Sequence, residues 1–107
     1  MSVAILFLAG EECLAEVPVA TEKQFQRCWG PVIKNLGLPL LGKWDAGVNI
    51  GPGDAPALIR EIQAVASFFR ERVSDDWRDD MVGRADRAVT AIQKYTRDTR
   101  VDSISLG

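Results

Sequence analysis

The side chains best suited to chemistry lie in one acidic octet, SDDWRDDM, which covers residues 74–81. Its four carboxylates surround Trp77 and belong to Asp75, Asp76, Asp79 and Asp80. Such a group could bind a metal ion, attract a basic partner, or stabilise the start of a helix. A calcium loop needs further oxygen ligands at fixed spacing, a central glycine and a terminal glutamate. The octet lacks this pattern, and a helix would splay its acids to two sides, so the sequence predicts no metal site.

Helix formation explains part of this acidity. Ser74 can cap a helix, and Asp75 and Asp76 then lie in the first turn, where each carboxylate contributes about 0.3–1 kcal/mol against the unpaired amides. Asp79 and Asp80 instead form like-charge i,i+4 pairs with these two acids, which oppose a helix by a similar amount. Asp80 and Arg84 form an opposite-charge i,i+4 pair, which weakly stabilises a helix. We therefore keep two interpretations, a solvated helix start and an acidic surface for a basic partner.

Further charged and aromatic candidates lie in turns and loops. Glu11 and Glu12 follow Gly10 at a tight turn, while Trp44 and Asp45 lie in an irregular stretch. A loop aromatic must dock on its own domain or meet a partner. The full set of candidate partner-binding residues is Asp75, Asp76, Trp77, Asp79, Asp80, Trp44, Asp45, Glu11 and Glu12.

The sequence contains few side-chain combinations that are typical of an enzyme active site. It has no histidine, the commonest general base and metal ligand, and therefore no Ser-His or Cys-His pair. The stretch GPGDAP at residues 51–56 resembles an anion-binding loop, but it lacks the Walker lysine. Asp54 would also place a negative charge where a phosphate should lie. We expect no catalytic residue and no cofactor.

Composition limits the remaining classes. The 107 residues fit one domain, residues 1–107, and the formal net charge of −2 is no broad cationic footprint, so we expect no direct contact with nucleic acid. Cys13 and Cys28 form no CxxC motif and are expected to be reduced and buried. The apolar start SVAILFLAG lacks a basic flank and is too short to span a bilayer. We expect a cytoplasmic protein without membrane contact.

The elements that must position these residues begin with a hairpin. Residues 2–9 form a nearly continuous apolar run, and residues 12–19 alternate, with Cys13, Ala15, Val17 and Val19 facing one way. Pro18 cannot donate to a ladder, so this second strand belongs at an edge. Thr21 and Gln24 form a capping box for a helix over residues 22–36, which Pro31 should kink or break after Gly30.

The second half of the chain is predicted to be mainly helical. Residues 38–53 are too rich in glycine and proline for a helix, although a short strand around residues 48–50 is expected. One amphipathic helix follows Asp54 and a second begins at Ser74. The tail RVDSISLG, residues 100–107, is predicted to form a last strand with Ile104 and Leu106 on one face. The fold class is α+β: an N-terminal hairpin and a C-terminal strand form a small antiparallel sheet packed with three helices, mainly on one face. If the first strand is central, both of its apolar faces need cover.

The order of these features resembles the small immunity proteins encoded beside bacterial polymorphic toxins, including those of contact-dependent inhibition systems. The stretches that carry the likeness are EVPVATEKQFQRCWGPVIKNLGL (16–38), KWDAGVNI (43–50), DAPALIREI (54–62) and the terminal SISLG. The resemblance implies a compact protein without catalytic activity that binds and neutralises the toxic domain of its cognate effector. Such toxins are often nucleases with basic clefts, to which acidic side chains of an inhibitor are complementary.

We therefore expect stoichiometric inhibition of a toxin domain by a monomer in a 1:1 complex. Two alternatives come from other classes. One is a small ligand-binding or enzymatic domain that uses residues 38–53 as a lid. The other is a structural subunit of a homo-oligomer paired through the strand edge at residues 12–19.

Overall fold

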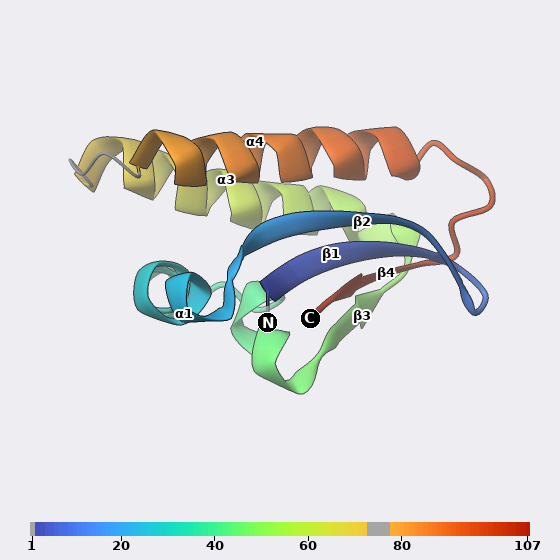
Figure 1. Cartoon of the computed structure of the whole chain (residues 1–107), viewed down its shortest axis with the longest axis horizontal. Helices are drawn as coiled ribbons and strands as arrows, with labels where there is room; N and C mark the ends of the chain where they lie inside the picture. The colour runs from blue at the N-terminus through green and yellow to red at the C-terminus, as the bar shows by residue number, and fades with distance from the viewer. Residues whose placement is uncertain (1, 73–77) are drawn as a thin grey trace.

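A computed structural model describes residues 2–72 and 78–107, with the backbone alone described for Ser2, Asp45, Ala46, Val48 and Arg72. Four antiparallel strands form one sheet in the order β2-β1-β4-β3. Their bounds are Ser2–Ala9 (β1), Glu12–Thr21 (β2), Val48–Ile50 (β3) and Ser103–Leu106 (β4). The predicted hairpin, the edge position of its second strand, the short strand and the last strand are all confirmed. The fold class is α+β, as expected (Figure 1).

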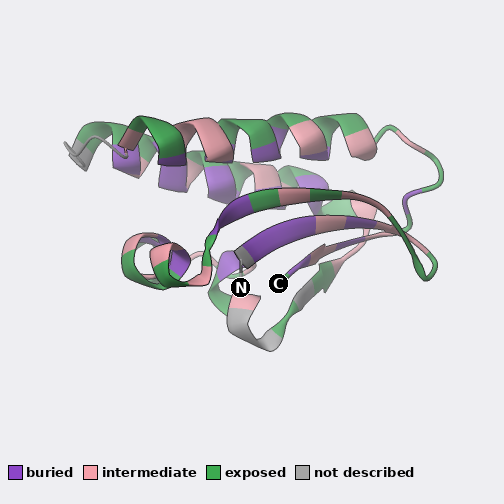
Figure 2. Ribbon diagram, in the orientation of Figure 1, coloured by how far each residue is buried: buried purple, intermediate pink, exposed green. Residues whose placement is uncertain are grey.

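The two faces of the central strand β1 differ in burial. Val3, Ile5 and Phe7 point into the core and are at most 2% exposed, and Phe7 stacks on Tyr95 of the last helix with ring centroids 4.6 Å apart. On the opposite face Leu6 and Leu8 stay only half-buried, beside Ser105 and Ser103 of β4 (Figure 2). The expectation that a central first strand needs full cover on both faces is therefore wrong. An antiparallel sheet tolerates one partly solvated face.

Two irregularities in the pairing of β1 with β2 alter which side chains are buried. The register shifts between Val3 and Ala4 and again between Phe7 and Leu8, so that β2 carries one extra residue at each point. A bulge of this kind reverses the alternation beyond it. Cys13 lies beyond the second shift and is exposed, whereas Val19 is buried. The predictions that Cys13 shares a face with Val19 and is buried are both wrong.

The helical segment after β2 runs without a break from residue 22 to residue 36. It consists of α1 (Glu22–Gln24), a π-helix (Phe25–Trp29) and α2 (Gly30–Leu36). The predicted cap is confirmed, since the Thr21 hydroxyl accepts a hydrogen bond from the Gln24 amide at 3.1 Å. Pro31 has no amide to offer, and the Gly30 amide just before it donates to the Phe25 carbonyl five residues back. The wider turn takes the place of the predicted break.

The connection between this segment and the next helix is ordered by short 3-10 turns. Gly37, at φ 65°, ends α2, and the Leu38 amide donates back to the Ile33 carbonyl at 3.1 Å. Two 3-10 helices follow, η2 (Leu41–Ala46) and η3 (Pro52–Asp54), on either side of β3. The carboxylate of Glu61 accepts from the Leu40 and Leu41 amides and so holds the start of η2.

The long helices α3 (Ala55–Arg72) and α4 (Arg78–Tyr95) lie side by side along one side of the sheet (Figure 1). Each buries one stripe at helical spacing, as the sequence predicts. The stripe of α3 includes Leu58, Ile62, Val65 and Phe69, and that of α4 includes Met81, Ala85, Ala88 and Ile92. Arg70 and Asp86 join the two helices across their exposed sides at 2.9 Å. The predicted helix start at Ser74 lies outside the described residues.

Candidate partner-binding surface

Asp79 and Asp80 occupy the first turn of α4. The Asp79 side chain is 89% exposed and lies 3.5 Å from the Arg78 guanidinium, while Asp80 accepts a hydrogen bond from Arg84 at 3.0 Å, the pair that their spacing predicts. Carboxylates in a first turn interact favourably with the helix dipole. This gives both acids a local stabilising role, whereas their predicted i,i+4 repulsion with Asp75 and Asp76 involves residues outside the described part of the chain. Asp75, Asp76 and Trp77 lie outside the described residues.

A cavity of about 510 Å³ separates this end of α4 from the helical segment after β2. Asp80 and Arg84 line one side, and residues from the first helical turns line the other. The latter are Thr21, Lys23, Gln24, Arg27 and Cys28. The fold thus brings Asp80 against a segment more than fifty positions earlier in the chain. Its charged lining consists of three cations and one carboxylate.

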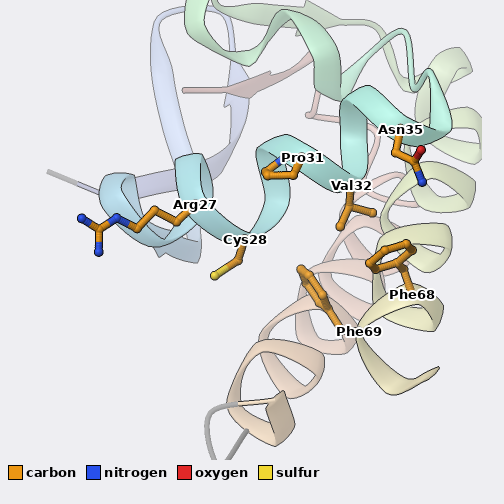
Figure 3. A pocket seen from close by; sticks show the side chains of 7 residues that line it. All are labelled: Arg27, Cys28, Pro31, Val32, Asn35, Phe68 and Phe69. Atoms are coloured by element: carbon orange, nitrogen blue, oxygen red, sulfur yellow. The ribbon is translucent and has the colours of Figure 1, made fainter. Parts of the chain in front are cut away.

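A second cavity, of about 380 Å³, continues from the first and shares Arg27 and Cys28 with it. Figure 3 shows its two walls: Cys28, Pro31 and Val32 on one, and Phe68 and Phe69 of α3 on the other. Arg27 lies at one end and Asn35 at the other. We call the two cavities together the groove, lined by Thr21, Lys23, Gln24, Arg27, Cys28, Pro31, Val32, Asn35, Phe68, Phe69, Asp80 and Arg84.

Two exposed cations lie on one wall of the groove, opposite Asp80. Lys23 and Arg27 are one helical turn apart and exposed, and no ion pair within the described part of the chain includes either of them. Cys28, next to Arg27, is half-buried rather than buried as expected, and neither cysteine is part of a disulfide. The groove therefore combines an apolar floor with a cationic end.

Trp44 packs on its own domain. Its ring meets Phe25 edge to face with centroids 4.6 Å apart, and the residue is half-buried. The remaining exposed part lines a separate hollow with Gly30, Gly37 and Lys34. Of the two alternatives for a loop aromatic, docking on the domain accounts for most of the Trp44 surface. The side chain of its neighbour Asp45 is outside the described part.

Glu11 and Glu12 lie at the turn of the hairpin, at the far end of the molecule from the start of α4 (Figure 1). Asp102 closes this turn by accepting the Gly10 amide at 2.8 Å. Nearby, the side chain and then the amide of Arg100 donate to Asp98 and lower the pKa of that carboxyl to about 2. The candidate residues therefore form separate groups rather than one patch, with Asp79 and Asp80 at one end and Glu11 and Glu12 at the other.

Sequence reasoning missed most of the groove. Lys23, Arg27 and Phe68, which line it, are absent from the predicted candidates. The pair Phe68-Phe69 was the available signal, because two adjacent aromatics on one helix cannot both point into the same core stripe. The sequence could not predict that the helical segment before Gly37 would lie opposite these two phenylalanines.

Wider comparisons add no relative to this description. No protein family, curated protein or solved structure matches the chain. Among the described residues, no three metal-binding side chains gather in one place. Across the same parts of the chain, none of the helices combines the length and apolar character needed to cross a bilayer. Function must therefore be inferred from the surface of the molecule.

Proposed function

We propose that this protein is the immunity protein of a bacterial toxin system, and that it neutralises a toxic protein domain by binding it in a 1:1 complex. The observation that carries the proposal is the end of the molecule where α4 begins. There an open groove with an apolar floor is bordered by exposed charges of both signs, Asp80 on one side and Lys23 and Arg27 on the other, and Asp79 is exposed in the same turn of α4 as Asp80. An apolar centre with a charged rim is typical of protein–protein interfaces.

In this proposal Asp79 and Asp80 pair with lysines or arginines of the toxin. Their position at the exposed start of a helix supports this role, because the side chains reach solvent from a rigid element. Long-range attraction between such charges speeds encounter and sets orientation more than it raises final affinity. The protein need not be a polyanion, and its formal net charge is only −2.

The two alternatives receive less support from the contacts. A lid formed by residues 38–53 would have to detach from Glu61, whose carboxylate accepts both the Leu40 and the Leu41 amide. Homo-oligomer pairing through β2 would use an edge interrupted by two register shifts and Pro18. Such features protect an edge strand from pairing with another chain.

Co-expression with the product of the adjacent upstream gene tests the proposal. We expect rescue of growth and a 1:1 complex in size-exclusion chromatography with mass measurement. A harmless neighbour that does not bind would refute the proposed function.

The contribution of the acidic end is tested by reversing two charges. We expect the double variant Asp79→Lys, Asp80→Lys to slow association with the toxin about tenfold at low salt, with a smaller effect at high salt. The matched control is Glu16→Lys, Asp54→Lys, which makes the same charge change at two exposed residues that are neither candidate partner-binding residues nor part of the groove. Equal association rates for the two variants would remove Asp79 and Asp80 from the interface.

A further inference from the structure

We infer that the groove binds an amphipathic helix of the toxic domain, with apolar side chains over the accessible surface of Cys28, Pro31 and Phe68 and a carboxylate beside Arg27. The inference rests on the proposed function, because it names the part of the toxin that this surface recognises. In this inference Lys23 and Arg27 bind acidic side chains of the toxin, whereas Asp79 and Asp80 bind basic ones.

The floor of the groove is apolar and accessible. Cys28 and Pro31 come from the helical segment before Gly37, and Phe68 comes from α3, and all three keep part of their surface open to the cavity. In Figure 3 Val32 points between the two phenylalanine rings, so the floor is continuous from one wall to the other. Apolar surface of this kind gains free energy when a partner side chain removes it from water.

A π-helix carries part of the lining of the groove. An α-helix through residues 25–31 would need the amide that Pro31 lacks, and the Gly30 amide instead closes a wider turn on Phe25. This turn carries Arg27 and Cys28, which line both cavities of the groove. Single π turns of this kind are frequent at functional sites.

The dimensions of the groove suit a helix. Within its apolar cavity, Cys28 and Asn35 are seven residues apart, which corresponds to about 10 Å along a helix. A partner helix lying in the groove presents two apolar side chains, at i and i+3 or i+4, within about the same length. The cavity of about 380 Å³ lies within the range of ordinary binding sites of about 300–1,000 Å³.

The charges of the groove select an acidic partner segment. Lys23 and Arg27 form no ion pair with the described residues, and Arg84 on the facing wall is held by Asp80 at 3.0 Å. Among the described residues, the lining holds three cations and one carboxylate, so its charge is net positive. A guanidinium and an ammonium in this arrangement are complementary to one or two carboxylates at the end of the partner helix. A basic helix would meet these two cations and be repelled.

Nuclear magnetic resonance titration with two synthetic helical peptides tests the inference. Both are about 14 residues long, four turns, with leucines at i, i+4 and i+7; one carries glutamates on its flanks and the other lysines. We expect the acidic peptide to shift the amides of residues 27–35, 68 and 69 in a saturable, salt-sensitive way. Equal shifts with the basic peptide, or no saturable shifts in the groove, would overturn the inference. Decanoate, a small molecule with an apolar chain and one carboxylate, tests whether the groove holds a small ligand instead of a helix. Saturable binding of decanoate without binding of the acidic peptide would also overturn the inference.

Variants connect the groove to the toxin. We expect Arg27→Glu to weaken binding of both the acidic peptide and the toxic domain about tenfold at low salt, and Phe68→Ala to weaken both at any salt concentration. Arg60→Glu is the matched control for charge, because Arg60 is exposed on α3 and lines no part of the groove. Circular dichroism melts check that every variant is folded.

The outcomes separate this inference from the proposed function. Rescue and complex formation by the wild-type protein, with unchanged toxin affinity for Arg27→Glu and Phe68→Ala, would overturn the groove inference and leave the immunity function standing. Absence of any complex between the wild-type protein and the toxic domain would overturn both. Parallel losses for peptide and toxin in Arg27→Glu, with Arg60→Glu unaffected, support the inference.

Discussion

Glu61 provides a sharp test of how this fold is held together. It is 7% exposed and the one charged residue among the buried ones that the structure describes. Its carboxylate accepts the Leu41 amide at 2.9 Å, and both of its oxygens lie 3.1–3.2 Å from the Leu40 amide. These amides start the η2 turn that carries Trp44. Replacing Glu61 should therefore loosen η2 and lower the stability of the whole domain.

The size of the effect follows from these hydrogen bonds. Each bond to a charged group contributes about 1.5–3 kcal/mol, and a buried donor left without an acceptor costs about 1–3 kcal/mol. Because the two bonds share one carboxylate, their contributions do not simply add. We expect Glu61→Ala to lower the free energy of unfolding by about 3–5 kcal/mol. Glu61→Gln keeps one acceptor oxygen and should cost about 1–2 kcal/mol.

Urea unfolding followed by tryptophan fluorescence measures these differences, and hydrogen exchange at Leu40 and Leu41 locates them. We expect exchange at these two amides to accelerate more than exchange in β1. Glu71→Ala is the matched control, since Glu71 is exposed on the same helix and should change stability by less than about 0.5 kcal/mol. If Glu61→Ala is as stable as Glu71→Ala, the carboxylate does not hold η2 and the reasoning is refuted.

Two further predictions concern Asp98, in the loop after α4, and Gly37, at the end of α2. The pKa of Asp98 is lowered to about 2 by Arg100, so the ionised carboxyl stabilises the folded state; this contribution is complete above about pH 4 and is lost as the pH falls toward 2. Acid unfolding of Asp98→Asn should therefore be less steep between pH 4 and pH 2, and an unchanged profile would contradict the assignment. Gly37→Ala should cost about 1–2 kcal/mol because of the positive φ alone, since nothing lies within 4 Å of the new methyl group. Gly42→Ala, whose methyl group would make an ordinary contact at 3.9 Å to Ile33, is its control, and equal thermal melts for the two would argue against backbone strain at Gly37.

Much of the fold could be predicted because it depends on local patterns. The unbroken apolar run of β1 indicates a central strand, and the helical spacing of Leu58, Ile62 and Val65 indicates one buried stripe whatever the rest of the chain does. The Thr21 cap and the Gly37 helix end depend on neighbouring residues only, and both are present in the structure. Local hydrogen bonding and side-chain periodicity are properties of the sequence itself.

Features that depend on distant partners could not be predicted in this way. The two register shifts in β2 appear only when β2 pairs with β1, and they are the reason that Cys13 is exposed. Similarly, Glu61 reads as one more polar position of a helix until the Leu40 and Leu41 amides, about twenty residues earlier, are placed against it. A long-range contact of this type leaves no local spacing signal.

The candidate surface likewise combines features that are local in the sequence with features that depend on distant residues. From the sequence alone, the octet at residues 74–81 identified Asp79 and Asp80 as unusual acids, and the absence of histidine removed much of ordinary enzyme chemistry. Only the tertiary structure placed Asp80 opposite Lys23 and Arg27, and Phe68 opposite Val32, to form the groove. The position of charges and the periodicity of apolar residues follow directly from the sequence. A groove forms only where two segments distant in sequence approach each other without filling the space between them.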